Sequence, residues 1–336
     1  MKIVRECSLK DKNTFGFDVK ADFYAEVESK EELKLLLSNS EYSQIPKIVI
    51  GSGSNILFRR DFKGIVIHPA IMDISIVGND CDYIYLRVGA GVVWDDLVQF
   101  CVDRGWGGVE NLSAIPGCTG AAPVQNIGAY GAEVSNVIHA VEFMFYNDLS
   151  AREFSCVECN FGYRDSIFKR ELKGCGIITY VTLRLTKNPV INANYEDVKH
   201  ALHGLDNPSI HTVRDIISSI RASKLPDPSV VGNAGSFFKN PVVSEKLALS
   251  IKNSHPSLKL FPSGEKYYKI PAAWLIEQCG FKGKRVGNVG VHAKQPLVLL
   301  AFEGATGDEL INLSHTIIQT VKERFNVDIE PEVNIC

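Results

Sequence analysis

The sequence predicts an α+β protein with more than one domain. The chain has 336 residues, which is more than one hydrophobic core usually serves. Runs rich in β-branched and aromatic residues alternate with amphipathic helical segments up to about residue 187, and helical periodicity dominates after Pro189. We therefore expect domains at residues 1–68, 69–188 and 189–336.

The overall composition is that of an ordinary globular protein. Hydrophobic residues make up 45% and charged residues 22%, with a formal net charge of −3. No run of Lys and Arg resembles a polyanion-binding arm, and no apolar stretch approaches the roughly 18 residues that span a membrane. The start, Met1–Cys7, lacks the apolar run of a signal peptide. We expect a cytoplasmic monomer that binds neither nucleic acid nor membrane.

The cysteines favour reduced thiols over a disulfide framework. There are nine of them, an odd number, scattered through apolar or glycine-rich segments. Cys156 and Cys159 form a C-x-x-C pair, but no second pair at zinc-binding spacing follows. We expect no metal site.

In the first expected domain, a helix and two strands surround a glycine-rich loop. Ser29-Lys30-Glu31-Glu32 has the form of a capping box, and the apolar residues that follow at helical spacing are Leu33, Leu36 and Leu37. The β-rich run 47–50 leads into Gly51-Ser52-Gly53-Ser54-Asn55, and a further strand is expected at 64–68.

In the second expected domain, a strand at 83–88 is followed by a glycine turn at 89–91. A helix from about Val93 to Arg104 follows, and Gly105 ends it. Further strands are expected at 141–146 and 177–185.

The third expected domain contains two marked helices. Residues 212–223 carry isoleucine and valine at helical spacing, and Pro226-Asp227-Pro228 ends that helix. Thr306-Gly307-Asp308-Glu309 caps a long amphipathic helix that reaches Phe325.

The loop Gly51–Asn55 follows a strand, so it must be compared with the dinucleotide-binding pattern G-x-G-x-x-G. The pattern fails because Ile56 stands where close helix packing needs glycine. A Gly/Ser loop still offers backbone N–H groups and hydroxyls that can hold a pyrophosphate. A plain turn is the alternative.

A long glycine-rich passage, from Asn111 to Gly131, favours a bound cofactor. Small residues recur where bulky ones would keep a ligand off the backbone, and Gln125 and Asn126 add uncharged donors and acceptors. A buried loop of this length packs poorly unless something fills it, as a flat cofactor with polar edges would.

The segment Asn233–Pro241 suits a proton-donating serine. Ser236 stands between Gly235, which allows a sharp turn, and two phenylalanines that would exclude water. A loop that merely buries Phe237 and Phe238 is the alternative.

Two further segments carry charged residues that could serve a substrate site. Arg164, in Phe161–Ser166, could hold a carboxylate bidentately with Asp165 orienting its surroundings, although a surface Arg–Asp pair would look the same. In Glu330-Pro331-Glu332 the proline turns the two acids apart, which favours separate roles over a carboxylate dyad; a solvated acidic chain end is the alternative.

Taken in order, these segments resemble the UDP-N-acetylenolpyruvoylglucosamine reductase family, flavoenzymes that reduce an enolpyruvyl ether in peptidoglycan precursor synthesis. The similarity extends over nearly the whole chain. It includes Asn13–Gly16, Gly51–Asn55, Ile115–Gly131, Phe161–Lys169, Lys224–Pro228, Asn233–Pro241 and Glu330–Val333. The resemblance implies two FAD-binding domains of the vanillyl-alcohol-oxidase (PCMH) type and a C-terminal α+β substrate-binding domain.

The resemblance also implies a cofactor and its contacts: non-covalent FAD, with NADPH as co-substrate. The residues it implies for FAD are Gly51, Ser52, Gly53, Ser54, Asn55, Ile115, Pro116, Gly117, Gly120, Ala121, Ala122, Gln125, Asn126, Gly128, Tyr130 and Gly131. Ala121 and Ala122 stand where many relatives have serine, which leaves backbone N–H groups as the donors there.

For the UDP-sugar substrate, the resemblance implies Tyr195, Lys224, Asn240 and Gln295, with Lys239, Lys269 and Lys282 as further neighbours. The segment Asn192–Asp197 resembles the tyrosine loop of the longer subtype of the family, whose tyrosine closes over the sugar nucleotide.

The implied catalytic residues are Ser236, Arg164 and Glu332. Hydride would pass from NADPH to flavin N5 and then to C3 of the enol ether, with Arg164 stabilising the charge that develops and Ser236 protonating C2. Glu332 would either bond Arg164 or be protonated beside the substrate carboxylate; both alternatives stay open.

Two other functions compete with this one. An FAD enzyme of the same fold that oxidises a small alcohol with oxygen would explain the glycine-rich loops but not Ser236, Glu332 or the lysines suited to a diphosphate. A non-catalytic sugar-nucleotide binder would need a change at one of the three catalytic positions, and none is present.

Overall fold

The chain folds into two units, which we call the first unit and the second unit. In the computed structural model, which describes residues 1–336, the first unit comprises residues 1–7, 20–53 and 62–221, and the second comprises 8–19, 54–61 and 222–336. Two short N-terminal segments therefore belong to the same unit as the C-terminal third. The three-domain division at residues 68 and 188 stays a prediction.

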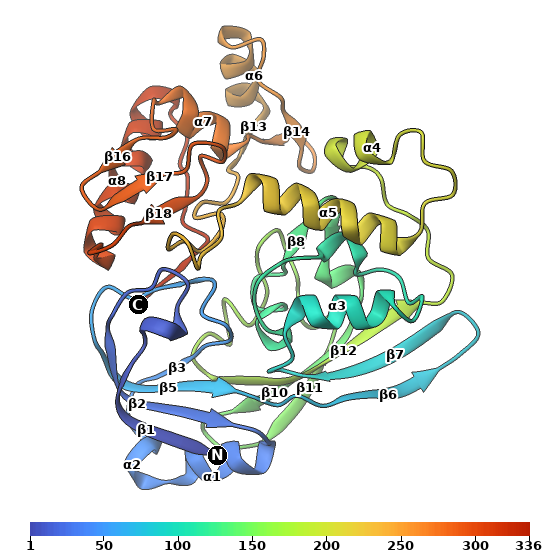
Figure 1. Ribbon diagram of the computed structural model, residues 1–336, viewed down its shortest axis with the longest axis vertical. Helices are drawn as coiled ribbons and strands as arrows, with labels where there is room; N and C mark the ends of the chain where they lie inside the picture. The colour runs from blue at the N-terminus through green and yellow to red at the C-terminus, as the bar shows by residue number, and fades with distance from the viewer. The chain divides into compact units, whose positions relative to one another are not determined.

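The first unit contains two larger sheets (Figure 1). One has four strands in the order β1-β2-β5-β3, in which β2 and β3 both pair with β5 in parallel. The other is antiparallel, in the order β11-β10-β12-β7-β6. Their strands are β1 (Lys2–Ser8), β2 (Lys20–Val27), β3 (Lys47–Val49), β5 (Phe62–Pro69), β6 (Ile74–Asn79), β7 (Tyr83–Gly89), β10 (Ile138–Phe145), β11 (Ala151–Ser155) and β12 (Gly176–Thr186).

Helices and short turns complete the first unit. The helices are α1 (Lys30–Ser38), α2 (Ser40–Ser43), α3 (Trp94–Val102), α4 (Glu196–Leu202) and α5 (Ile210–Lys224). The 3₁₀ turns η2 (Glu110–Leu112), η3 (Thr119–Ala121) and η4 (Val134–Asn136), with the short hairpin β8 (Gly128–Ala129) and β9 (Ala132–Glu133), shape the glycine-rich passage. The last residues of α5 belong to the second unit.

The second unit is built from small sheets and three helices. A sheet of order β13-β15-β14 and another of order β16-β17-β18 are both antiparallel, and β19 pairs with β4 in parallel. The elements are the 3₁₀ turn η1 (Lys10–Lys12), β4 (Ile56–Leu57), β13 (Val242–Ser244), α6 (Glu245–Ser254), β14 (Phe261–Pro262), β15 (Tyr267–Lys269), α7 (Ala272–Gln278), β16 (Arg285–Val286), β17 (Val289–Val291), β18 (Leu299–Ala301), α8 (Gly307–Phe325) and β19 (Asn334–Ile335).

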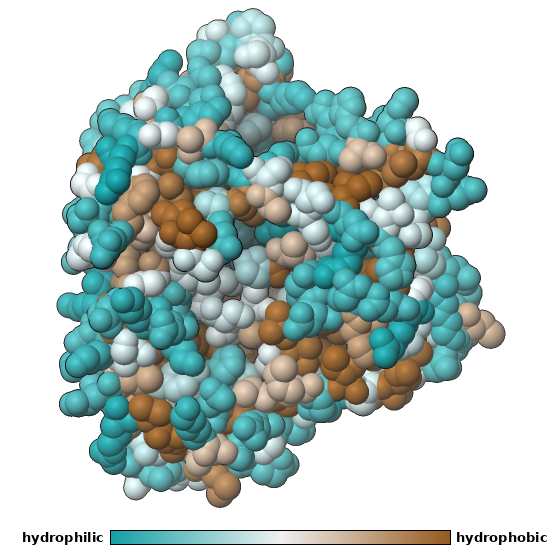
Figure 2. Space-filling view, in the orientation of Figure 1, coloured by the Kyte–Doolittle hydropathy of each residue, from teal (hydrophilic) through white to brown (hydrophobic).

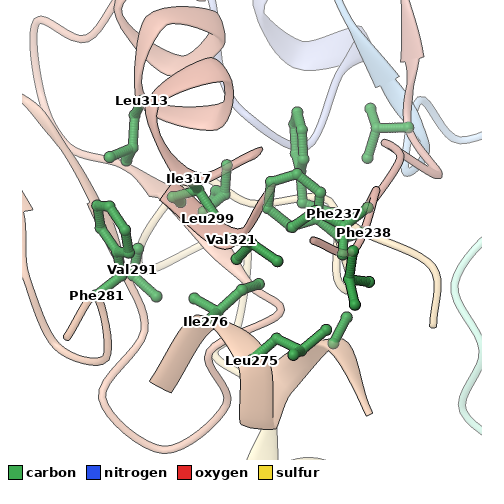
Figure 3. Close-up of a cluster of buried hydrophobic side chains, with 14 of the residues drawn as sticks. Phe237, Phe238, Leu275, Ile276, Phe281, Val291, Leu299, Leu313, Ile317 and Val321 are labelled. Carbon is green, nitrogen blue, oxygen red and sulfur yellow. The ribbon is translucent and has the colours of Figure 1, made fainter. Parts of the chain in front are cut away.

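One hydrophobic core holds the second unit together. Side chains from α7, α8 and β18 pack around Phe237 and Phe238, each of which is 1% exposed (Figure 3). The N-terminal Phe15 and Phe17 and the β4 residue Leu57 belong to the same core. Burying this apolar area is why residues 8–19 and 54–61 join the C-terminal part of the chain.

The expected regular elements are confirmed with boundaries shifted by a few residues. Thr306 and Glu309 form the full capping box at α8. At α1, Ser29 accepts from the Glu32 N–H, but the Glu32 carboxylate accepts from the Glu28 N–H instead of the Ser29 N–H, so the reciprocal box is not formed. Strands β1, β2 and β6 were not expected from the sequence.

The surface is mixed in character. On the face drawn in Figure 2, hydrophilic residues cover most of the area, and hydrophobic residues form separate small patches. None of the helices combines the length and the hydrophobicity that crossing a lipid bilayer requires.

A charged cluster around Glu142 connects the antiparallel sheet of the first unit to helix α1. The Glu142 carboxylate, on β10, accepts hydrogen bonds from Thr179 Oγ1 at 2.6 Å and from Arg87 Nη2 at 3.2 Å. Lys30, at the start of α1, donates to it at 3.2 Å. Burial alone would raise the pKa of Glu142, but the hydrogen bonds from Thr179 and Lys30 and the nearby positive charges hold it below its usual value.

We expect Glu142→Gln to lower the free energy of unfolding by about 1–3 kcal/mol, because the two cations lose their half-buried partner. Since the folded-state pKa is lowered, the stabilisation is present above the usual glutamate pKa of 4.5 and is lost as the pH falls through the folded-state value. The gap between wild type and variant should therefore narrow in acid, which urea denaturation at several pH values measures.

Glu153→Gln is the matched control. Glu153 lies directly opposite Glu142 on β11 and is exposed. If both substitutions changed stability equally, the cluster would not be the cause.

Candidate cofactor and substrate site

Two glycine-rich loops of the first unit lie side by side. Gly51–Gly53 follows β3, and a Cβ atom placed on Gly51 would lie 3.2 Å from the Cβ and Sγ atoms of Cys118. The Ser52 Oγ and Cys118 Sγ atoms are 3.3 Å apart. The structure thus brings together the two loops that the sequence predicts to bind the cofactor phosphates.

The second loop is closely tied to the turn that follows β7. Gly117 O accepts from the Trp94 N–H at 3.0 Å, and the Gly120 N–H donates to Ala90 O at 3.0 Å. A Cβ atom on Gly120 would lie only 2.6 Å from that of Ala90, so this position requires glycine. The N–H groups of Ala121 and Ala122 donate to Cys118 O and Thr119 O. The backbone donors that the resemblance implies for the cofactor at these two positions are therefore used by hydrogen bonds within the loop.

Ala114, just before this loop, is held at both of its backbone polar groups. It has a left-handed φ of 57°, which is uncommon for alanine. Its N–H donates to Asp95 Oδ1 at 2.5 Å, and its C=O accepts from Arg221 Nε at 3.0 Å. Arg214 in turn donates to both carboxylate oxygens of Asp95, at 2.6 and 2.9 Å. We call these four residues the Ala114 clamp.

The clamp joins α3 to α5, which lie next to each other (Figure 1). Burial alone would raise the pKa of Asp95, but the hydrogen bonds from Arg214 and from the Ala114 N–H hold it below its usual value. Asp95 is therefore a carboxylate at neutral pH. The contacts of the Ala114 clamp could not be predicted from the sequence, because the residues that make them are far apart in the chain.

Asn126 and Tyr130 shape the end of the glycine-rich passage. Both have left-handed φ values, 46° and 48°. The Asn126 amide donates to Glu133 Oε2 and Gly162 O, and it accepts from the Ser135 N–H. These side-chain hydrogen bonds stabilise the turn, and the contact of Asn126 with the cofactor stays a prediction. Of the other implied cofactor residues, Ile115, Pro116, Gln125, Gly128 and Gly131 lie on the same passage.

Arg164 lies against the backbone of this passage. Its Nη2 donates to Gly128 O at 2.5 Å, and a Cβ atom on Gly128 would lie 2.8 Å from its Nη1. Arg164 itself has a left-handed φ of 55°. Asp165 does not pair with Arg164 but with Arg170. The guanidinium is thus positioned by a predicted cofactor turn.

The backbone around Ser236, in the second unit, is held by hydrogen bonds, and we call this arrangement the backbone frame of Ser236. Gly235 before it has a φ of 66°, and its N–H donates to the buried Asn233 side chain at 3.0 Å. Ser236 forms a backbone bridge with Val298, and the Phe237 N–H donates to Leu297 O at 2.7 Å. The phenylalanine pair is buried in the core, next to the serine in the chain, and the proton-donating role of Ser236 stays a prediction.

Glu332 lies on the segment that pairs with the other side of this frame. The Glu332 N–H donates to Phe237 O at 2.7 Å, and the Lys239 N–H donates to Glu330 O at 3.1 Å. The second unit therefore brings Ser236 and Glu332 together on neighbouring backbone segments. Glu330 is ion-paired with Lys239 at 2.5 Å, and the separate roles of the two acids stay a prediction.

The predicted substrate residues occupy several elements. Tyr195, 44% exposed, precedes α4, and its ring meets the Tyr130 ring edge-on at 5.1 Å. Lys224 ends α5. Asn240 Oδ1 accepts from the Ala272 N–H at the start of α7, and Gln295 Oε1 accepts from the Leu297 N–H. Of the further lysines, Lys282 is paired with Glu277.

The predicted residues divide between the units. Arg164, Tyr195 and most of the implied FAD contacts belong to the first unit, whereas Ser54, Asn55, Lys224, Ser236, Asn240, Gln295 and Glu332 belong to the second. The residues fit FAD: two loops of small residues meet at Gly51 and Cys118, Gly120 packs too closely on Ala90 for any side chain, and the preceding Ala114 is clamped. Such loops can accommodate a pyrophosphate close to the backbone.

Two protein families match separate parts of the chain. An FAD binding domain family matches residues 21–148. The family described as UDP-N-acetylenolpyruvoylglucosamine reductase, C-terminal domain, matches residues 227–336.

Relatives match over the full length. The UDP-N-acetylenolpyruvoylglucosamine reductase of Amoebophilus asiaticus is 46% identical over 100% of this chain and 99% of its own. The reductase of the same name from Flavobacterium johnsoniae is 42% identical over 100% of both chains.

Solved structures establish the fold. The reductase of Thermus caldophilus superposes with a TM-score of 0.68 at 24% identity, covering 99% of this chain and 98% of its own. The 6-hydroxy-D-nicotine oxidase of Arthrobacter nicotinovorans gives 0.55 at 15% identity, covering 97% and 86%. The predicted fold is confirmed: a FAD-binding fold of the vanillyl-alcohol-oxidase type with an added C-terminal α+β domain. The full-length identity to its relatives shows that the chain belongs to the UDP-N-acetylenolpyruvoylglucosamine reductase family, FAD-dependent oxidoreductases of peptidoglycan precursor synthesis.

Proposed function

We propose that this protein uses NADPH to reduce the enolpyruvyl ether of UDP-N-acetylglucosamine-enolpyruvate, giving UDP-N-acetylmuramate. The observation that carries the proposal is the backbone frame of Ser236, which is paired with Val298 and adjoins the segment of Glu332. A serine held this rigidly suits proton transfer to a fixed carbon atom. Cytoplasmic location and a monomeric state stay predictions.

The two glycine-rich loops and the Tyr130 turn would hold FAD. The Ala114 clamp fixes the entry to the second loop, and Arg164 braces the turn through Gly128 O. When bound there, FAD would supply the hydride chemistry that reduces C3 of the substrate, with NADPH as the reductant.

Arg164 would stabilise the negative charge that develops at C2 and on the adjoining substrate carboxylate. Its hydrogen bond to Gly128 O restrains the guanidinium in advance, so less entropy is lost when the substrate binds. Glu332 would serve the same reaction by bonding Arg164 or by carrying a proton beside the substrate carboxylate.

Ser236 would donate the proton to C2, so that the product gains a hydride and a proton. In water a serine hydroxyl is a weak acid, but an enolate carbon is basic enough to accept its proton. The buried Phe237 and Phe238 keep the serine in place.

The UDP moiety would be held by Tyr195, Lys224, Asn240 and Gln295. A diphosphate needs cationic or hydrogen-bonding partners when it leaves water. The alcohol-oxidase alternative loses its support, because the full-length relatives are reductases of the enolpyruvyl sugar nucleotide by name.

The direct test is turnover by the purified holoenzyme. We expect NADPH consumption that depends on the enolpyruvyl sugar nucleotide, and a product heavier by two hydrogen atoms in the mass spectrum. NADPH oxidation that proceeds equally without the sugar nucleotide would contradict the proposal.

We expect Ser236→Ala to lower turnover by about 10²–10⁴-fold, because a positioned proton donor is lost. NADPH should still bleach the bound flavin at a near-normal rate in stopped-flow measurements. Ser257→Ala, at an exposed position of the second unit, should change neither rate. A variant that takes up FAD but cannot be reduced by NADPH would rule out this role for Ser236.

We expect Asp95→Asn to weaken FAD binding by about tenfold or more, because a charge-assisted pair that restrains the Ala114 clamp is lost. Fluorescence titration of the flavin-free protein with FAD measures the dissociation constant. Asp96→Asn makes the same charge change at the exposed neighbouring residue and should leave FAD binding unchanged. Equal dissociation constants for both variants would show that the clamp does not support the cofactor loop.

A further inference from the structure

The turn that carries Arg164 is short and tightly closed. The Gly162 N–H donates to Asp165 O at 3.0 Å, and the Asp165 N–H donates back to Gly162 O at 3.2 Å. Arg164 lies between them with a left-handed φ of 55°, a conformation that residues other than glycine adopt when their surroundings hold them there. We call residues 162–165 the arginine turn, because its conformation decides where the guanidinium lies.

The arginine turn is bonded to the side chain of Asn126. Asn126 Nδ2 donates to Gly162 O at 3.0 Å, the same carbonyl that closes the turn. It also donates to Glu133 Oε2 at 2.8 Å, and Asn126 Oδ1 accepts from the Ser135 N–H at 3.1 Å. Asn126 is only 1% exposed, so its amide depends on partners within the protein.

Glu133 determines which way the Asn126 amide faces. Turning the amide over would point its oxygen at the Glu133 carboxylate and at Gly162 O, which is repulsive. An anionic acceptor at Glu133 therefore favours the orientation in which Asn126 bonds the arginine turn. Glu133 is partly buried on β9, where it pairs with Gly128 of β8.

The Arg164 side chain contacts the same β8–β9 hairpin. Its Nη2 donates to Gly128 O at 2.5 Å, and its Nη1 donates to Asn126 O at 3.5 Å. A Cβ atom on Gly128 would lie 2.8 Å from Arg164 Nη1 and 3.0 Å from Glu133 Cγ, so both side chains pack on the same side of this glycine. The hairpin region thus holds the arginine turn at its base and the arginine side chain at its tip.

We propose that Glu133 is a positioning residue for Arg164, acting through Asn126 and Gly162. This inference rests on the proposed function, in which Arg164 stabilises the negative charge that develops on the substrate. The Glu133 carboxylate orients the Asn126 amide, the amide holds Gly162 O, and the closed turn keeps Arg164 in its left-handed conformation. Without this hydrogen bond the guanidinium moves from the position that the substrate needs, and such displacements lower the reaction rate.

Glu133→Ala removes the acceptor, and its effect should be confined to the substrate step. In stopped-flow measurements on the FAD-loaded enzyme, we expect NADPH to reduce the flavin at a near-normal rate. Reoxidation of the reduced flavin by UDP-N-acetylglucosamine-enolpyruvate should be about tenfold slower, as for the loss of one buried hydrogen bond. Amide hydrogen exchange of residues 162–166 should become faster without substrate, because the turn opens more often.

Two further variants separate the hydrogen bond from the charge. Glu133→Gln keeps an oxygen that accepts from Asn126 Nδ2 but carries no charge, and should slow reoxidation at most about threefold. Glu133→Asp keeps the charge on a side chain one CH₂ group shorter, which takes the carboxylate out of hydrogen-bond reach. It should slow reoxidation and speed exchange nearly as much as Glu133→Ala. These two variants decide the question on their own if Glu133→Ala does not fold.

Asn136→Ala is the control for a local disturbance of the hairpin region. Asn136 is exposed, and its Oδ1 accepts from the Glu133 N–H at 3.0 Å. The substitution removes a hydrogen bond to the Glu133 backbone and leaves the carboxylate in place. It should change neither flavin rate and should leave the exchange of residues 162–166 as in wild type.

Equal slowing of flavin reduction and reoxidation in Glu133→Ala would indicate a general disturbance and overturn the proposal. Unchanged reoxidation with unchanged exchange would also overturn it. Rescue by Glu133→Asp instead of Glu133→Gln would assign the effect to charge and exclude the route through Asn126. A wild-type enzyme whose reduced flavin is not reoxidised by the sugar nucleotide would instead contradict the proposed function, and the exchange comparison would still decide whether Glu133 restrains the arginine turn.

Discussion

The ion pair between Asp95 and Arg214 is the interaction on which the organisation of the cofactor region depends. Two hydrogen bonds join the carboxylate to the guanidinium, at 2.6 and 2.9 Å, and thereby connect α3 to α5. The same carboxylate fixes the Ala114 N–H, while Arg221, two turns further along α5, fixes the Ala114 carbonyl. The strained alanine is restrained from both sides, and the glycine-rich loop begins from a defined point.

The residues that restrain Ala114 are also connected to the Tyr130 turn. Arg221 also bonds Tyr130, whose carbonyl is held by Asn111, and the Tyr130 ring meets Tyr195. Predicted contacts for the cofactor and for the sugar nucleotide therefore share one hydrogen-bonded scaffold in the first unit. In the second unit, backbone pairing gives Ser236 and the Glu332 segment a comparable rigidity.

Local features could be predicted from the sequence, and long-range ones could not. The Thr306 capping box, the α3 and α5 helices and the strands that became β7 and β12 all have signals within a few residues of each other. The resemblance supplied the family and the fold, which the comparisons confirm.

The Ala114 clamp had no such signal. Asp95 is 19 residues from Ala114 and 119 from Arg214 along the chain, and an acid in the first turn of a helix usually needs no partner. Nothing in the sequence indicates that the Asn126 side chain bonds Glu133, Gly162 and Ser135, and its contact with the cofactor stays a prediction. The parallel strand β2 was missed because its buried positions do not alternate regularly.

The path of the chain through the second unit has a consequence for how the protein is made. Strand β4, near residue 56, finds its partner only in β19, and Leu57 and Arg59 exchange backbone hydrogen bonds with Cys336. Segments synthesised early therefore remain without their partner strand, with apolar side chains such as Leu57 uncovered, until residues 334–336 have also been synthesised. During this interval the nascent chain offers exposed apolar surface that a chaperone could shield.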